Sequence, residues 1–134
     1  MPSQTQAQFG FTKIIVSDVD RLLAFYRDVF GLAQVSRIKQ GEGDFELDEI
    51  IMATAGSSQL IPSLVIQRYP NRPVPAPGEA TLGFIVNDLE RTLAAATAAG
   101  ATIERPAWTA SEHGVRVAFL KDIDGHLVEV VQTL

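Results

Sequence analysis

The sequence predicts an α+β domain made of two tandem modules, each with the order strand, helix, strand, strand, strand. The first observation is an internal repeat, in which the string IIVSDVDRLLA recurs as FIVNDLERTLA seventy positions later. The second is a change of pattern, because each copy passes from a short β-rich run to apolar residues three and four apart, the spacing of an amphipathic helix. The third is that three β-rich runs follow each helical pattern.

In the first module, the run Thr12 to Val16 is expected to form a strand and to lead directly into a helix. Ser17 and Asp20 have the spacing of a capping box, and Gly31 follows the helix where a left-handed cap is common. One face of this helix carries the bulky residues Leu22, Phe25, Tyr26, Val29 and Phe30. The later strands are expected in AQVSRIK, FELDEIIMATA and SLVIQR, with GEGD as a turn between the first two.

The second module repeats this order with a strand at Leu82 to Val86, a capping box of Asn87 and Glu90, and a helix that ends on Gly100. Its later strands are expected in TIERPAW, VRVAFLK and HLVEVVQ. The segment YPNRPVPAPGE carries four prolines and is expected to be a semi-rigid connector. We therefore expect one domain over residues 1–134, with module one at about 9–68, a linker at about 69–79 and module two at about 80–133.

Composition limits the function classes. The chain has 134 residues, a formal net charge of −5, a pI near 4.9 and no cysteine. Its eleven basic residues are scattered singly, which argues against binding to nucleic acid or to an anionic membrane. The absence of cysteine excludes disulfides, thiolate metal sites and a cysteine nucleophile. The polar N-terminal segment lacks a secretory pattern, so we expect a cytoplasmic protein.

Two strings indicate a family. The first-module string DVDRLLAFYRDVFGL and the closing string DIDGHLVEVV, together with paired βαβββ modules, resemble the vicinal oxygen chelate superfamily from about Phe11 to Gln132. That superfamily includes glyoxalase I, extradiol dioxygenases, methylmalonyl-CoA epimerase and the bleomycin and fosfomycin resistance proteins. The resemblance implies two sheets curling into an incomplete barrel around a shared cavity, commonly in a homodimer. It also implies a divalent metal on the inner wall that stabilises an enolate or oxyanion.

The resemblance also implies where metal ligands would lie. In the family, one ligand of each module lies on the first strand at a fixed spacing before the Asp that opens the helix, and these positions are Phe11 and Thr81 here. A further ligand, a Glu, follows the glycine of the last turn, and this position is Glu129. The remaining position falls within Ser63 to Ile66, which offers no imidazole or carboxylate. Because transition-metal sites need three or four ligands, we expect no metal or other cofactor. The alternative is a zinc, iron, nickel or manganese site in which a strand bulge brings in Glu79, His113 or His126.

Glu129 is the main candidate site residue. It lies in the apolar run Leu127 to Val131, where an ionised carboxylate is costly unless a partner meets it. Lys13 is the expected partner across the cavity, either as a structural ion pair or as a stabiliser of an oxyanion beside Glu129 as general base or hydrogen-bond acceptor. Strand alternation adds the cavity-lining residues Phe11, Ile15, Thr81, Gly83, Ile85, Leu127 and Val131.

Four further residues carry alternatives. His113, in a segment where the family often has a mobile lid, is either a proton-transfer residue or a solvated histidine. Trp108 either stacks on a flat ligand or packs structurally. Arg116 either points into the cavity, where it could hold a carboxylate, or is solvated. His126 is expected to be structural.

Two function classes follow. The favoured one is a metal-independent protein, like the bleomycin resistance branch, that holds a small apolar or aromatic ligand in the inter-module cavity. The alternative is an isomerase, epimerase, lyase or dioxygenase that acts next to a carbonyl, with Glu129 as base or metal ligand. In both cases we expect a homodimer.

Overall fold

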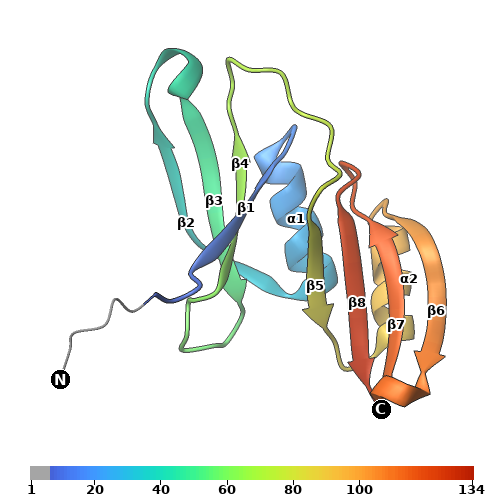
Figure 1. The fold of residues 1–134 in the computed structure, drawn as a ribbon. Coiled ribbons are helices and arrows are strands. Elements are labelled where there is room, and N and C mark those ends of the chain that lie inside the picture. Colours follow the sequence, from blue (N-terminus) through green and yellow to red (C-terminus); the bar gives the residue numbers. More distant parts are fainter. Residues whose placement is uncertain (1–6) are drawn as a thin grey trace.

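The structure is a computed structural model that describes residues 7–134, and it confirms the predicted α+β fold of two tandem βαβββ modules (Figure 1). Module one contains β1 (Phe11–Ile15), α1 (Val19–Phe30), β2 (Leu32–Gln40), β3 (Leu47–Thr54) and β4 (Ser63–Arg68). Module two contains β5 (Thr81–Ile85), α2 (Leu89–Ala98), β6 (Thr102–Ala110), β7 (Val115–Lys121) and β8 (Leu127–Thr133). Two short 3-10 turns, η1 (Gly43–Phe45) and η2 (Ser111–His113), lie between strands. Neither helix in residues 7–134 is long and apolar enough to span a membrane.

Each module forms a four-stranded sheet with one helix on one face. The strand orders are β1-β4-β3-β2 and β5-β8-β7-β6, so the two sheets have the same topology (Figure 1). β1 pairs with β4, and β5 with β8, in parallel, whereas the remaining pairs are antiparallel. The register places Lys13 opposite Val65 and Gly83 opposite Glu129. Val65 is therefore the module-one counterpart of Glu129.

The predicted capping boxes are wrong by one residue. The N-caps are Asp18 and Asp88, whose side chains accept hydrogen bonds from first-turn amides, for example from Asp20 N at 3.0 Å and from Arg91 N at 3.1 Å. Both caps have an extended backbone and a carboxylate near the positive end of a helix, which is a favourable place for it. Gly31 ends α1 in the left-handed conformation, with φ of 70°, as predicted.

An aromatic cluster joins the two modules. Tyr26 and Phe30 project from α1, four residues apart and so on one face of the helix, and both stack on Phe84 of β5. The Phe30 and Phe84 ring centroids are 3.9 Å apart, and Tyr26 is fully buried. Because these residues of α1 pack against β5, α1 forms part of the core of both modules. Burying a large aromatic side chain contributes about 2–3 kcal/mol to stability.

A polar cluster completes the junction between the modules. Asp122, in the turn between β7 and β8, accepts a hydrogen bond from the Tyr26 hydroxyl at 2.6 Å and one from His126 Nδ1 at 2.9 Å. His126 Nε2 donates to the Ile15 carbonyl oxygen on β1 at 3.1 Å. Both imidazole nitrogens therefore face acceptors, which requires the protonated ring. We call Tyr26, Asp122, His126 and the Ile15 carbonyl the module clamp.

The pKa values of the module clamp follow from these contacts. Burial opposes charge on His126, but the hydrogen bond and the charge of Asp122 outweigh burial and raise its pKa above the ordinary value. Burial likewise opposes charge on Asp122, yet the hydrogen bonds from His126 and Tyr26 hold its pKa below the ordinary value. Burial, followed by the charge of Asp122, raises the pKa of Tyr26. Each group is thus held in the protonation state that the hydrogen bonds need.

Replacing Tyr26 with Phe tests the module clamp. The substitution keeps the aromatic stack but removes the hydroxyl donor to a buried carboxylate, so the free energy of unfolding should fall by about 1–3 kcal/mol. Urea unfolding of the wild type and the variant measures this change. Tyr69→Phe is the matched control and should change stability by less than about 0.5 kcal/mol, because the Tyr69 hydroxyl makes no hydrogen bond within residues 7–134. Equal losses in the two variants would contradict the importance of the Tyr26 donor.

The module clamp also predicts how stability depends on pH. Because the pKa of His126 is raised on folding, its contribution is complete below the ordinary value of 6.5 and is lost as pH rises through the folded pKa. Because the pKa of Asp122 is lowered, its contribution is present above the ordinary value of 3.8 and is lost as pH falls through the folded pKa. Thermal unfolding should thus show a plateau between these values and a decline on the alkaline side. His126→Gln should remove that decline, whereas His113→Gln, at the exposed second histidine, should keep it.

Candidate functional site

Glu129 lies on the face of the second sheet that is turned away from α2. Its neighbours Val128 and Val130 belong to the buried core, so alternation along β8 directs Glu129 to the opposite face, between Leu127 and Val131. The side chain is half-buried, and its carboxylate makes no hydrogen bond or ion pair with any residue in the range 7–134. An apolar strand therefore presents one carboxylate without a protein partner.

A strip of side chains crosses this face beside Glu129. Gly83 of β5 and Phe119 of β7 lie directly opposite Glu129 on the two flanking strands. Beyond Phe119, Trp108 of β6 stacks on the Phe119 ring with centroids 6.0 Å apart. The Arg105 guanidinium lies 3.6 Å from the Trp108 ring centroid. We call Gly83, Glu129, Phe119 and Trp108 the Glu129 strip.

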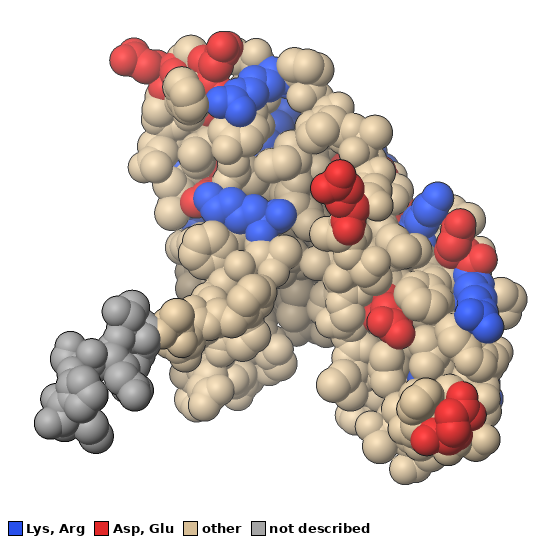
Figure 2. Space-filling view, in the orientation of Figure 1, with Lys and Arg blue, Asp and Glu red and all other residues tan. Residues whose placement is uncertain are grey.

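Space remains in front of the Glu129 strip at one end. A Cβ atom built on Gly83 meets no other atom within 4 Å, and the backbone there is one that any residue adopts. Gly83 leaves room for about one small group beside the carboxylate. Figure 2 shows the strand side of the molecule, where charged side chains lie singly or in small groups with uncharged surface between them.

The predicted ion pair of Lys13 with Glu129 is wrong. The Lys13 ammonium instead donates to Glu49 Oε2 and to Gln67 Oε1, each at 2.9 Å, within the first sheet. Glu49 and Gln67 are 7% and 1% exposed, so module one contains its own buried partner set for the lysine. Sequence reasoning missed both residues, because each lies at the end of an apolar run next to a charged residue, Glu49 after Asp48 and Gln67 before Arg68, and so lacks the signal that identified Glu129.

Arg116 does not line the cavity as predicted. Its guanidinium donates to Glu90 of α2 and to Thr109 at 3.0 Å, so the side chain lies toward the helix-covered side of the second sheet. Alternation explains the error, because Val117, the next residue, takes the opposite face, where it pairs with Val131. His113 ends η2 and is exposed, without a hydrogen bond or ion pair in residues 7–134, and its role in proton transfer stays a prediction.

The other predicted lining residues do not surround one enclosed space. Thr81, Gly83 and Ile85 border a cleft of about 480 Å³ between the modules, which is visible as the hollow between the two halves in Figure 2. Phe11 is 58% and Ile85 82% exposed. The wall of this cleft is otherwise made by Phe9, Thr12, Phe30, Leu32, Met52, Ala53, Thr54, Pro62, Ser63, Leu64, Ala80, Leu82 and Phe84.

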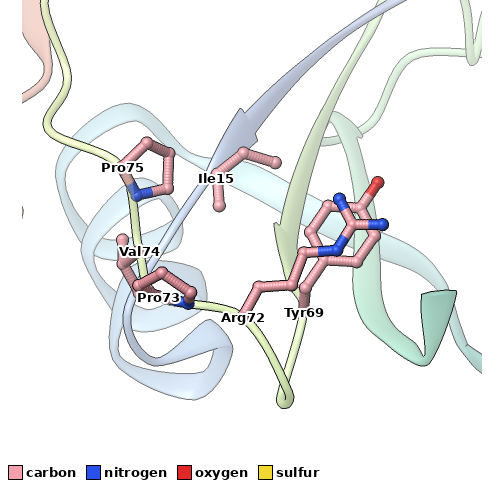
Figure 3. Close-up of a pocket in the computed structure, with 6 residues that line it drawn as sticks. All are labelled: Ile15, Tyr69, Arg72, Pro73, Val74 and Pro75. Carbon is pink, nitrogen blue, oxygen red and sulfur yellow. The ribbon is translucent and has the colours of Figure 1, made fainter. Parts of the chain in front are cut away.

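Ile15 lines a different pocket, of about 300 Å³, beneath the proline-rich linker (Figure 3). The linker is fixed there by Arg72, whose guanidinium lies 4.1 Å from the Tyr69 ring centroid and 5.1 Å from that of Phe45, and by Asn71, which donates to the Gly43 carbonyl at 2.8 Å. Ile15 therefore lines a pocket of module one and the linker, whereas the Glu129 strip belongs to module two.

The residues on these faces do not fit a metal with three protein ligands. In residues 7–134, no three His, Asp or Glu side chains come together in positions that could hold an ion. Phe11, Thr81 and Val65 occupy the other positions at which a ligand was expected, and none carries a donor suited to zinc, iron or nickel. The prediction that the protein carries no cofactor stays a prediction.

Comparisons with known proteins identify the family. The family model described as Glyoxalase/Bleomycin resistance protein/Dioxygenase superfamily matches residues 8–130, so the chain belongs to this superfamily. No curated protein matches the chain significantly. The fold is shared with a glyoxalase family protein from Bacillus cereus, which has 18% sequence identity and a TM-score of 0.83 over 100% of this chain and 99% of that one.

Two further solved structures have the same fold. TioX from Micromonospora sp. ML1 is 23% identical, with a TM-score of 0.64 over 96% of this chain and 100% of that one. The fosfomycin resistance protein FosX from Listeria monocytogenes is 16% identical, with a TM-score of 0.68 over 97% and 96% of the two chains.

Proposed function

We propose that this member of the superfamily binds a small, largely apolar or aromatic molecule on the Glu129 strip, with the Glu129 carboxylate accepting a hydrogen bond from it. The observation that carries the proposal is a half-buried carboxylate without a protein partner on an apolar sheet face. Placing a carboxylate there costs stability, because its solvation is reduced without a compensating ion pair. A ligand donor would supply that compensation.

The contrast with module one supports a functional reason for this cost. Lys13 donates to Glu49 and to Gln67, each at 2.9 Å, and every fully buried side-chain nitrogen and oxygen atom in residues 7–134 has a hydrogen-bond partner. The chain therefore satisfies its buried polar groups elsewhere. The carboxylate of Glu129 differs from these groups because it has kept access to solvent, and the same access admits a ligand.

The Glu129 strip also offers shape. Phe119 and Trp108 provide flat apolar surface on one side of the carboxylate, and Gly83 provides room on the other. Ligand sites commonly combine a largely apolar wall with few polar groups that fix orientation. A neighbour in fold is named for fosfomycin resistance, which supports a small molecule as the partner of this fold.

Filling the space beside Glu129 tests the binding site. In a thermal-shift screen of aromatic and keto-acid compounds, some compound should raise the melting temperature of the wild type in proportion to log concentration. Gly83→Leu should abolish the shift, because its side chain would occupy the open space beside the carboxylate. Gly78→Leu is the matched control, since Gly78 also has open space and an ordinary backbone but lies in the linker. Glu129→Gln should weaken binding by about tenfold if the carboxylate accepts a hydrogen bond.

Two results would contradict this proposal. If Gly83→Leu and Glu129→Gln leave every ligand response unchanged while Glu129→Gln raises stability, Glu129 is a tolerated structural charge. If metal analysis of protein purified without chelator finds a stoichiometric transition metal, or if a keto acid is turned over rather than bound, the enzyme alternative with Glu129 as base or metal ligand replaces binding.

We also propose that the protein forms a homodimer through the apolar residues at the mouth of the inter-module cleft. Phe9 and Ile85, which border the cleft, are 70% and 82% exposed, and Leu60 and Ile61, which precede Pro62 of the cleft wall, are 53% and 44% exposed. Exposed apolar patches often mark protein–protein interfaces. Light scattering coupled to size-exclusion chromatography should give twice the chain mass of 14.5 kDa, and Ile85→Lys should reduce the dimer fraction. A wild-type monomer at all concentrations would contradict the proposal.

A further inference from the structure

The charge of the ligand can be inferred from the charges around the Glu129 strip, and this inference rests on the proposed function. The other charged side chains of module two near this face already have partners. Lys121 pairs with Glu104 at 3.8 Å, Arg116 is held by Glu90 on the helix side, and Arg105 lies on the Trp108 ring. Glu129 is the carboxylate on this face for which residues 7–134 provide no partner; the Arg105 cation, which has no acidic partner in that range either, lies over Trp108 on β6, two strands from Glu129.

Lys13, the cation that the sequence analysis expected to pair with Glu129, also has partners within module one. Lys13 on β1 donates to both Glu49 and Gln67, and Glu49 neutralises its charge. Moving Lys13 to Glu129 would leave a buried carboxylate at Glu49 without its partner, which is strongly unfavourable. The protein therefore leaves the charge of Glu129 to be balanced from outside.

The aromatic part of the Glu129 strip favours a planar cation. The Arg105 guanidinium lies 3.6 Å from the Trp108 ring centroid, so this surface already accommodates a flat delocalised cation from the chain itself. Phe119 lies between Trp108 and Glu129 and has its ring nearly parallel to that of Trp108, at 17°. A second planar cation could lie along Phe119 with its N–H groups directed at Glu129.

The spacing of the strands sets the size of such a molecule. Glu129, Phe119 and Trp108 lie on three successive strands, and neighbouring strands are about 4.8 Å apart, so the distance from carboxylate to indole is about 10 Å. A fused bicyclic aromatic ring that carries one amidine has about this length. An amidinium also presents two parallel N–H groups, which match the two oxygens of a carboxylate.

We propose that the Glu129 strip is selective for planar aromatic cations of the amidine or guanidine class, with the Glu129 carboxylate binding the cationic group and Phe119 and Trp108 binding the ring. The overall charge of −5 acts in the same direction, because it attracts cations at long range. Neutral aromatic compounds bind the same site more weakly, and anionic ones are excluded.

Three probes that share one skeleton test the proposal: 2-naphthamidine, which is cationic, 2-naphthamide, which is neutral, and 2-naphthoate, which is anionic. Calorimetric titration of the full chain should show that the amidine binds at least about tenfold more tightly than the amide, because a charge-assisted bidentate hydrogen bond is stronger than a neutral one. The naphthoate should bind more weakly than the amide. Raising the salt concentration should reduce the ratio between amidine and amide.

Variants separate charge from shape. Glu129→Gln should weaken the amidine by a larger factor than the amide, so that the ratio between the two affinities falls to near one. Glu42→Gln is the matched control, because Glu42 is an exposed acid of module one whose side chain makes no hydrogen bond or ion pair in residues 7–134, and it should keep the wild-type ratio. Trp108→Ala should weaken the amidine and the amide by the same factor.

The failures of the two proposals are distinguishable. Equal affinity of amidine and amide for the wild type, or an unchanged ratio in Glu129→Gln, overturns the selectivity for cations; the binding proposal then survives if Gly83→Leu still abolishes binding of the amide. If Gly83→Leu changes the binding of no probe, both proposals are wrong. If none of the three probes binds, the selectivity for cations is wrong, and the thermal-shift screen decides the binding proposal.

Discussion

The hydrogen bonds accepted by Asp122 hold the two modules in one arrangement. Two separate four-stranded sheets share no strand pairing, so their relative position depends on side chains at the junction. Inside the protein, Asp122 accepts hydrogen bonds from the Tyr26 hydroxyl and the His126 imidazole, and His126 in turn donates to the backbone of β1. Because these bonds lie in a region of low dielectric and all their members are satisfied, they are stronger than equivalent bonds at the surface. The apolar stack of Tyr26, Phe30 and Phe84 fixes the distance between the two modules, and the module clamp fixes their relative orientation.

Duplication gave the two sheets one topology, but their helix-free faces differ in chemistry. At equivalent registers, module one has Lys13 opposite Val65, and module two has Gly83 opposite Glu129. Module one surrounds its lysine with an acid and an amide, and so its polar groups are satisfied internally. Module two has Gly83 where module one has Lys13, and it has the lone acid Glu129 where module one has Val65. The fold tolerates both solutions because the helix-covered faces, which contain the core, have the same apolar alternation in each module.

Much of the fold could be predicted from the sequence because the repeat, the apolar spacing and the turn glycines are local signals. The two helices, the order of helix and strands along each module and the left-handed cap at Gly31 depend on such signals. The caps were misplaced because Ser17 and Asp18 are both good cap residues, and a contact of Ser17 with Asp124, 107 positions away, occupies its hydroxyl. The partner of Lys13 was likewise misassigned, since strand parity gives the face of a side chain but not which of several acids on different strands lies within reach. Tyr26 and His126 appeared as a core residue and a turn residue, and only the tertiary structure brings them to Asp122.

The cost of the lone carboxylate explains why the modules need a firm junction. A binding site that keeps an uncompensated charge on an apolar sheet gives up some stability, and natural proteins are stable by only about 5–15 kcal/mol. In this chain the sheet that carries Glu129 is also the sheet whose β7–β8 turn contains Asp122 and His126, three to seven residues before Glu129. The same short segment therefore contributes the destabilising charge and the buried hydrogen bonds that offset it. Glu129 lies three residues after His126 of the module clamp, so the clamp also fixes its position relative to Phe119 and Gly83. For the ligand proposed above, a carboxylate fixed in this way would lower the entropy cost of binding.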